Sequence, residues 1–271
     1  MIDIGLNLAS KRFKNKHELI RKALKEGVKG FILTGTSLEE SKKVCQLADE
    51  LSDCARFTAG FHPHNAKYWD AKAAEQLTGL IEHPLCVAVG ECGLDYDLDR
   101  MFSSKEEQHL AFQAQLELAI QHNKPVFLHL RSALTKTGTQ EILEDFKRIA
   151  QPYIEQGLKG VVHCFTDNTY MARELLALGF YLGITGWLTD QKRGADLRRA
   201  VELIPLDRLL IETDAPYLLP HNLPERPKDK TNKPEYLPYV LQAVAQSKRV
   251  TPEQLETITN DNVEQLFGVR F

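Results

Sequence analysis

The chain of 271 residues is 43% apolar and 26% charged, which is typical of a soluble globular protein large enough for one sizeable α/β domain. Its net charge of -3 excludes a global positive field, so a nucleic-acid partner would need a local basic patch. The five cysteines lack CxxC pairing and no apolar window approaches the roughly 20 residues of a membrane span, so we expect a reduced, cytoplasmic protein without membrane contact.

Eight short runs of apolar and β-branched residues recur along the chain and predict strands. They cover residues 2–7, 30–36, 56–64, 87–96, 125–131, 160–165, 180–186 and 209–216. The segments between them have helical spacing. In 104–123 this spacing places Leu110, Ala114 and Leu118 on one face, and 37–51 has the same period.

Strands that alternate with helices predict parallel βαβ units. Eight such units in about 250 residues have the size of a closed (β/α)8 barrel of the TIM type. An open doubly wound sheet is the alternative, but the first strand-to-helix turn lacks the GxGxxG and Walker patterns of its nucleotide-binding form. Because the sequence has no internal repeat, low-complexity tract or linker, we expect a single α/β domain over residues 1–271.

Polar and charged side chains gather where the predicted strands end. They are His62, His64, Glu91, Asp95, His129, Arg131, His163, Glu212 and Asp214. Four of the nine histidines and four carboxylates therefore fall on the carboxyl-end face, where the chemistry of such barrels lies. The alternative is a hydrogen-bonded barrel mouth without metal. We expect ordinary surface or core roles for the remaining histidines, which are His17, His83, His109, His122 and His221.

Glu91 lies at the end of the buried run VAVGECGLDY, where a charge is costly unless it is paired or coordinates a metal. We therefore expect Glu91 to hold a cation together with His129 and His163. Asp214 would supply a further carboxylate or act as a base. This mixture of donors suits zinc, manganese, cobalt or iron, whereas magnesium prefers oxygen ligands. A metal at this face generates hydroxide from water, so hydrolysis is the favoured reaction class.

Six motifs stand in one order along the chain: GFHPH, VGECGLDY, PVFLHLR, VVHCFT, GITGW and IETDAPYLLP. With these motifs, and on to the closing ITNDNVEQLFGV, the chain resembles the TatD-type metal-dependent deoxyribonucleases from end to end, most of all their bacterial members. The resemblance implies a metallo-dependent hydrolase barrel, which agrees with the strand count. It also implies Mg²⁺-dependent 3′–5′ exonuclease action on single-stranded DNA or RNA, with a part in DNA repair.

Carried over by position, the resemblance makes Glu91 a metal-bridging carboxylate and makes His129 and His163 metal ligands. Asp214 would be a ligand or the base, and His62 would lie near the scissile phosphate. Mg²⁺ is the ion implied for activity, while the two imidazoles favour Zn²⁺ or Mn²⁺ at their own site.

The first strand departs from the family pattern. Many members have HxH there, whereas the run IDIGLNL has Gly5 and Asn7 at those positions. Glycine offers no side chain, and Asn7 offers a single amide oxygen. We therefore expect one tightly held ion at His129 and His163 and a second, looser site that is rich in oxygen ligands.

The loop after the last predicted strand, HNLPERPKDKTNKPEY (221–236), is basic and stiffened by prolines. Its cations are Arg226, Lys228, Lys230 and Lys233. Because the loop closely follows Asp214, we expect its lysines to bind phosphates, with Arg131 and His64 as further substrate-binding residues. A solvated charged loop is the alternative. Three aromatic residues near strand ends either stack on unpaired bases or pack in the core: Phe165, Trp187 and Tyr217.

Two other functional classes stay open. An amidohydrolase or esterase, including D-aminoacyl-tRNA deacylation, would use the same metal-bound water on a carbonyl, but a small neutral substrate would not need the basic loop. A non-enzymatic binding protein with a degenerate metal site would not need the full set of predicted metal-binding side chains. We expect the protein to act as a monomer on its single-stranded DNA or RNA substrate.

Overall fold

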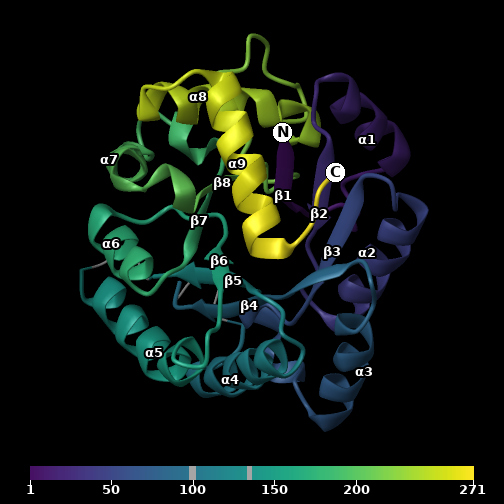
Figure 1. Cartoon of the computed structure of the whole chain (residues 1–271), viewed down its shortest axis with the longest axis vertical. Coiled ribbons are helices and arrows are strands. Elements are labelled where there is room, and N and C mark those ends of the chain that lie inside the picture. The colour runs from purple at the N-terminus through teal and green to yellow at the C-terminus, as the bar shows by residue number, and fades with distance from the viewer. Residues whose placement is uncertain (98–101, 133–135) are drawn as a thin grey trace. The chain divides into compact units, whose positions relative to one another are not determined.

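The computed structural model describes residues 1–97, 102–132 and 136–271 (Figure 1). In this part of the chain, eight strands follow one another through the sheet in sequence order. They are β1 (Ile2–Leu6), β2 (Gly30–Leu33), β3 (Ala55–Ala59), β4 (Cys86–Asp95), β5 (Val126–Arg131), β6 (Gly160–Val162), β7 (Tyr181–Ile184) and β8 (Leu209–Ile211). Each falls within one of the eight predicted runs or overlaps it by most of its length, so the predicted (β/α)8 class of TIM-type fold is confirmed.

Helices separate the strands, as the spacing predicted, and two further helices follow the last strand. They are α1 (Lys16–Lys25), α2 (Leu38–Glu50), α3 (Ala71–Ile81), α4 (Lys105–Gln121), α5 (Lys136–Ile154), α6 (Thr169–Ala177), α7 (Ala195–Leu203), α8 (Leu237–Lys248) and α9 (Pro252–Phe267). Local signals explain where several begin. Ser104 and Glu107 form a capping box at the start of α4, and Thr251 and Gln254 form another at the start of α9. No helix in the described ranges combines the length and apolar character that a bilayer span requires.

The buried face of α4 differs from the predicted one. Leu110 is 62% exposed, and the helix instead buries a face that includes Phe112, Leu116 and two glutamines. Gln108 accepts a hydrogen bond from the Asp95 backbone N–H (2.8 Å) and donates to the Asp95 carbonyl (3.0 Å). The spacing of apolar residues does not predict this face, because it includes buried glutamines whose side chains form hydrogen bonds with the backbone of neighbouring segments.

By internal contacts the chain divides into two compact units. Unit 1 comprises residues 1–33, 51–55 and 164–271, and unit 2 comprises residues 34–50 and 56–163. The expectation of one domain over residues 1–271 stays a prediction.

Unit 1 contains the first and last strands of the sheet. Within it β1 pairs with β2 and β7 with β8, both in parallel. Leu6 at the end of β1 forms a parallel bridge with Ala215, just beyond β8, so the two ends of the strand order lie side by side. Helix α9, yellow in Figure 1, packs against both β1 and β8.

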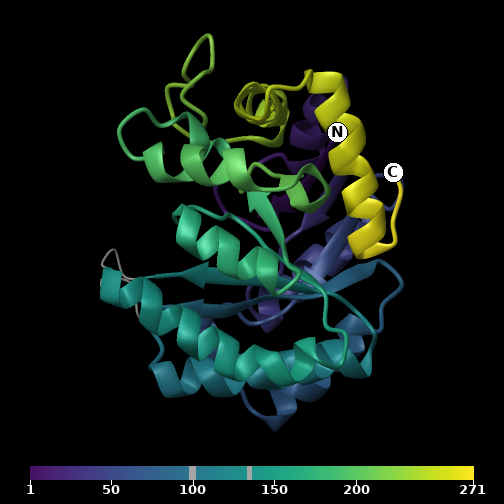
Figure 2. The ribbon, with the colours of Figure 1, turned by 60° about the vertical axis from the view of Figure 1, so that its left-hand side comes forward.

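Unit 2 contains the middle of the sheet. The strand β4 pairs in parallel with β3 on one side and with β5 on the other, and β5 pairs with β6. Helices α4 and α5 lie side by side, as Figures 1 and 2 both show. Because all these strands are parallel, the side chains at their carboxyl ends share one edge of the sheet.

Candidate functional site

Four histidines and two carboxylates converge at the carboxyl ends of the unit 2 strands. Glu91 and Asp95 belong to the second half of β4, where Asp95 is the last residue; His129 belongs to β5, and His163 directly follows β6. His62 and His64 come from the segment after β3, where a short 3-10 helix, η1 (Pro63–Tyr68), begins. The structure thus brings together every unit 2 histidine that was predicted from a strand end.

Glu91 is the centre of this cluster. Its Oε1 lies 2.7 Å from His163 Nε2 and 3.0 Å from His129 Nδ1. His62 Nε2 is 3.5 Å from the same oxygen. The carboxylate is 5% exposed, so it is removed from solvent and faces three imidazole rings.

Asp95 forms a second contact of the cluster and was not among the metal or catalytic residues predicted from the sequence. Its Oδ2 lies 3.1 Å from His129 Nε2 and 2.9 Å from His64 Nε2. The ring of His129 is therefore held between two carboxylates, with Nδ1 toward Glu91 and Nε2 toward Asp95. A signal for this role was present, because Asp95 lies four residues after Glu91 and strand side chains alternate with a period of two.

The charges of these groups follow from their contacts. Burial alone would raise the pKa of Glu91, but the charges of His163 and His62 and a hydrogen bond from His129 hold it well below its usual value. Burial alone would lower the pKa of His129, but its hydrogen bonds to Asp95 and Glu91 raise it. Burial, aided by repulsion from His129, lowers the pKa of His62 to about 3, so that ring is neutral near pH 7.

Backbone hydrogen bonds fix the positions of the residues that carry these side chains. The N–H of Glu91 donates to the Gly35 carbonyl (2.7 Å), and the N–H of His62 donates to the Thr36 carbonyl (2.9 Å). Gln115 of α4 clamps the residue before His62, because it accepts from the Phe61 N–H (2.7 Å) and donates to the Phe61 carbonyl (3.2 Å). The site therefore rests on a rigid frame of buried polar contacts.

A divalent cation fits the donors of this cluster. One ligand atom from each of Glu91, His129 and His163 lies within 4.8 Å of the other two, and a second such group joins His62, Asp95 and His129. The rings of His163 and Phe127 stack at 4.5 Å, which orients the His163 imidazole. Two imidazoles and an ionised carboxylate are the ligands of a borderline cation such as Zn²⁺ or Mn²⁺.

The remaining predicted ligand, Asp214, belongs to unit 1. It follows β8 and accepts a hydrogen bond from Asn7 Nδ2 (2.8 Å) and from Cys164 Sγ (3.7 Å). Asn7 thus presents its amide nitrogen to Asp214, in the role of a hydrogen-bond donor to that carboxylate. The neighbours of Asp214 in unit 1 are therefore an amide and a thiol that donate hydrogen bonds to it, in contrast to the imidazoles around Glu91.

Glu212 takes the space beside Gly5. A Cβ at position 5 would lie 2.0 Å from Glu212 Oε2, so the glycine leaves room for this carboxylate at the first strand. Glu212 is fully buried, and its Oε1 accepts a hydrogen bond from the Cys164 N–H. The sequence showed Glu212 at a strand end, but only the structure shows that it fills the place of a side chain missing from β1.

The predicted substrate-binding residues have different surroundings. Arg131 pairs with Asp97 (2.9 Å), and His64 pairs with Asp95. Lys228 and Lys230 are exposed on the loop of unit 1, and Lys233 Nζ lies 5.9 Å from the centre of the Tyr236 ring.

The three strand-end aromatics separate into two groups. Phe165 is buried, as a core residue would be, whereas Tyr217 is 48% exposed and Trp187 is half-buried. Arg12 covers the ring of Tyr217 at 5.3 Å, and Arg193 covers that of Trp187 at 4.3 Å. Tyr217 and Trp187 are therefore the two of the three that keep exposed surface.

Comparison with known proteins shows which family the chain resembles. Residues 2–268 match the family described as TatD related DNase. The 3′-5′ ssDNA/RNA exonuclease TatD of Escherichia fergusonii is 43% identical over 272 residues, which cover 100% of both chains. The protein of the same name from Cronobacter sakazakii is 45% identical, over 98% of this chain and 97% of its own.

A solved structure agrees with these relatives. The TatD homolog of Escherichia coli K12 superposes with a TM-score of 0.84 at 27% identity, over 100% of this chain and 98% of its own. The fold, the order of the motifs and the full-length relatives all lead to one assignment. The chain belongs to the TatD family of related DNases, and the predicted class of metal-dependent hydrolase is confirmed.

Proposed function

We propose that this protein is a metal-dependent 3′–5′ exonuclease that hydrolyses phosphodiester bonds of single-stranded DNA and RNA. The observation that carries the proposal is the buried Glu91 carboxylate, which faces His163 Nε2 at 2.7 Å and His129 Nδ1 at 3.0 Å. The names of relatives at 43 and 45% identity support the choice of bond and strand.

Glu91, His129 and His163 would hold the ion. A divalent ion bound there lowers the pKa of a water molecule toward neutrality and polarises a phosphoryl oxygen. Asp95 acts on the ring of His129, because it fixes Nε2 and so leaves Nδ1 to face the ion. The neutral His62 accepts a hydrogen bond at Nδ1 from the His64 N–H (3.1 Å), so its ring proton is on Nε2, which lies 3.5 Å from Glu91 Oε1. This ring would lie near the scissile phosphate.

Asp214 serves as a further ligand or as the base that accepts the proton of the attacking water. Its hydrogen bonds from Asn7 and Cys164 hold the carboxylate in one orientation. Lys228, Lys230 and Lys233 bind phosphates of the strand, with Arg131 and His64 as additional contacts. Together these roles would allow cleavage of a charged backbone without reading the base sequence.

The proposed ion for turnover is Mg²⁺, with Zn²⁺ or Mn²⁺ as the ion that the imidazole site holds most tightly. His129 and His163 would hold one ion, and a second would bind together with the substrate phosphate. We place the enzyme in the cytoplasm as a monomer with a role in DNA repair or turnover.

A labelled oligonucleotide tests the proposed activity. Single strands carrying a 5′ label, and the same strands with a phosphorothioate block at the 3′ end, are incubated with Mg²⁺ or Mn²⁺ and with EDTA. We expect stepwise shortening of the unblocked strand, no shortening of the blocked strand and none in EDTA. Intact strands combined with ester hydrolysis of an aminoacyl-tRNA would overturn the proposal in favour of a deacylase.

A further inference from the structure

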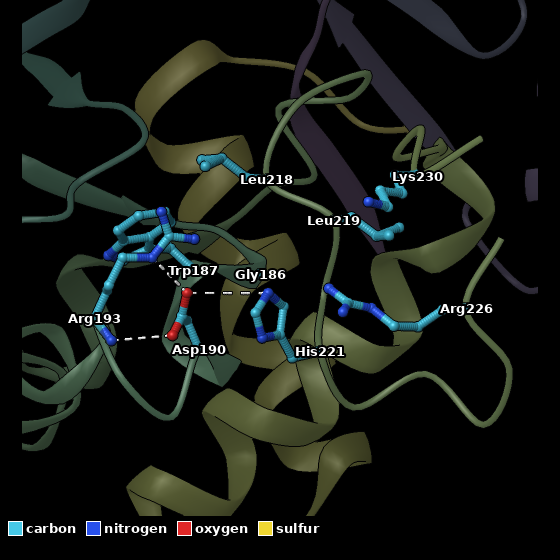
Figure 3. A pocket seen from close by; sticks show the side chains of 9 residues that line it. All are labelled: Gly186, Trp187, Asp190, Arg193, Leu218, Leu219, His221, Arg226 and Lys230. Atoms are coloured by element: carbon cyan, nitrogen blue, oxygen red, sulfur yellow. Dashed lines mark hydrogen bonds and ion pairs between the residues drawn. The ribbon is translucent and has the colours of Figure 1, made fainter. Parts of the chain in front are cut away.

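A pocket lies in unit 1, away from the histidine cluster in the sequence. Its volume is about 210 Å³, and Figure 3 shows the side chains that line it. One wall comes from the segment after β7, with Trp187, Asp190 and Arg193, and the other from the loop after β8, with His221, Arg226 and Lys230. Because β7 and β8 are parallel, both walls stand at the carboxyl-end edge, from which Asp214 also projects.

The first wall is a built platform. The guanidinium of Arg193 lies 4.3 Å from the centre of the Trp187 ring, and its Nε donates to Asp190 Oδ2 at 2.7 Å (Figure 3). The backbone N–H groups of Lys192 and Arg193 donate to the other oxygen of Asp190. Hydrogen bonds from the backbone and side chain of Arg193 lower the pKa of Asp190 to about 2, so this carboxylate is ionised and pairs with the Arg193 guanidinium beside the Trp187 ring.

The close packing of the two walls requires a glycine. A Cβ at Gly186 would lie 2.7 Å from Pro220 Cγ and 2.8 Å from the Leu218 carbonyl oxygen. Gly186 therefore packs directly against the Pro220 ring and the Leu218 carbonyl. Such a close contact between the two segments favours a preformed pocket, and with it binding without rearrangement.

The second wall supplies positive charge. Arg226 and Lys230 are exposed, and Figure 3 shows the guanidinium of Arg226 pointing toward the ring of His221. Arg193 is balanced by Asp190, so the net charge of the lining comes from Arg226 and Lys230. Two cations beside a flat guanidinium suit a ligand that joins a planar ring to an anion.

We propose that this pocket is a nucleotide subsite for the single strand, outside the metal centre. A base stacks on the outer face of Arg193, which Trp187 supports from behind, and the adjacent phosphate lies between Arg226 and Lys230. The volume is below the roughly 300–1,000 Å³ of pockets for drug-sized ligands, which fits one base of a longer chain. The inference rests on the proposed nuclease function, since it assigns the pocket to the same strand.

The experiment compares two pairs of charges on one loop. The pocket pair is Arg226→Ala with Lys230→Ala, and the matched pair is Lys228→Ala with Lys233→Ala, neither of which lines the pocket. Each variant loses two positive charges. Binding of a fluorescein-labelled 12-nucleotide oligo-dT is measured by anisotropy in EDTA at several salt concentrations, so that no hydrolysis is needed.

We expect the pocket pair to raise the Kd by at least tenfold and to reduce the salt slope by about 0.7 per lost phosphate contact. The matched pair should change both quantities clearly less. Equal losses in the two pairs would overturn the proposal, because the loop would then act only as a diffuse field of charge. An unchanged Kd in the pocket pair would overturn it as well.

Fluorescence tests the base contact separately. The chain has two tryptophans, so Trp69→Phe leaves Trp187 as the single emitter. Thymidine 5′-monophosphate should quench this emission and should displace the oligonucleotide at lower concentration than inorganic phosphate. Equal competition by the two would overturn the stacking on Arg193.

The kinetics of hydrolysis provide the last test of the subsite. With Mn²⁺ the pocket pair should raise KM and leave kcat within about twofold of the starting value, as expected when uniform binding energy is lost. If the wild type binds strands through the pocket but never shortens them, the proposed function fails while the subsite stands.

Discussion

The histidine cluster of unit 2 and the carboxylates of unit 1 use different partners. Around Glu91 stand three imidazoles, whereas Asp214 accepts hydrogen bonds from the amide of Asn7 and the thiol of Cys164. Imidazole is a strong ligand for borderline cations, and carboxylate with amide and water suits a hard ion held more loosely. We therefore expect the tighter affinity for a divalent ion to reside in unit 2.

The first strand explains why unit 1 lacks that chemistry. Glycine at position 5 gives its space to Glu212, and Asn7 turns its amide nitrogen to Asp214. The two positions that carry histidines in many family members therefore make room for Glu212 and donate a hydrogen bond to Asp214.

Glu91→Gln should have the largest effect. The amide keeps the shape but cannot supply the charge that a bridging carboxylate offers, so hydrolysis of labelled single strands should fall below a few per cent of the wild-type rate. Circular dichroism and thermal unfolding check that the variant is folded. A folded variant that retained substantial activity would remove Glu91 from the centre of the account.

Asp3→Asn is the matched control, since Asp3 is also a fully buried carboxylate but contacts no histidine. Activity should be retained. Burial raises the pKa of Asp3 to about 7, against hydrogen bonds from Thr213. Because this lies above the model-peptide value of 3.8, the stability that Asp3 contributes is lost as pH rises through 7.

The Asp3 shift also gives a pH signature. From pH 5 to pH 8 the unfolding free energy of wild type should fall relative to Asp3→Asn by about 2–3 kcal/mol, as urea unfolding at both pH values can measure. Parallel stability profiles for the two proteins would show that Asp3 is ionised throughout.

Asp95→Asn should have an intermediate effect. The variant weakens the acceptor that orients His129, and loss of such an outer contact typically costs 10- to 100-fold in metal affinity or activity. Titration with Mn²⁺ should show weaker activation, while saturating ion restores part of the rate. An activation curve that superposes on that of wild type would assign Asp95 to structure alone.

Asn7→Ala should have the smallest effect. It removes one hydrogen bond to Asp214, which corresponds to at most about tenfold in rate. The amount of ion retained after dialysis should not change, because the imidazole cluster is untouched. A loss of bound ion equal to that in His129→Ala would erase the contrast between the two units.

Most of the fold could be predicted from the sequence. Strand runs and helical spacing carry their own period, so eight alternating units are visible without a structure. The face of α4 could not be predicted, because Gln108 and Gln115 are buried to hold the backbone at Asp95 and Phe61.

The site, too, contains residues that the sequence could predict and contacts that it could not. Glu91, His129 and His163 could be found because each lies in the second half of a strand or directly after one, and parallel strands end at one edge. The carboxylate pair around His129 and the exchange between Gly5 and Glu212 depend on distances between segments far apart in sequence. His221 was assigned an ordinary role, yet it lines the pocket with Arg226, because two separate loops meet there.

The metal content of dialysed protein shows whether the histidine cluster of unit 2 holds the ion. Elemental analysis should give one tightly held ion per chain, and anomalous scattering from crystals should place it beside Glu91, His129 and His163. Two ions held equally without substrate, or a single ion bound away from His129 and His163, would contradict the account.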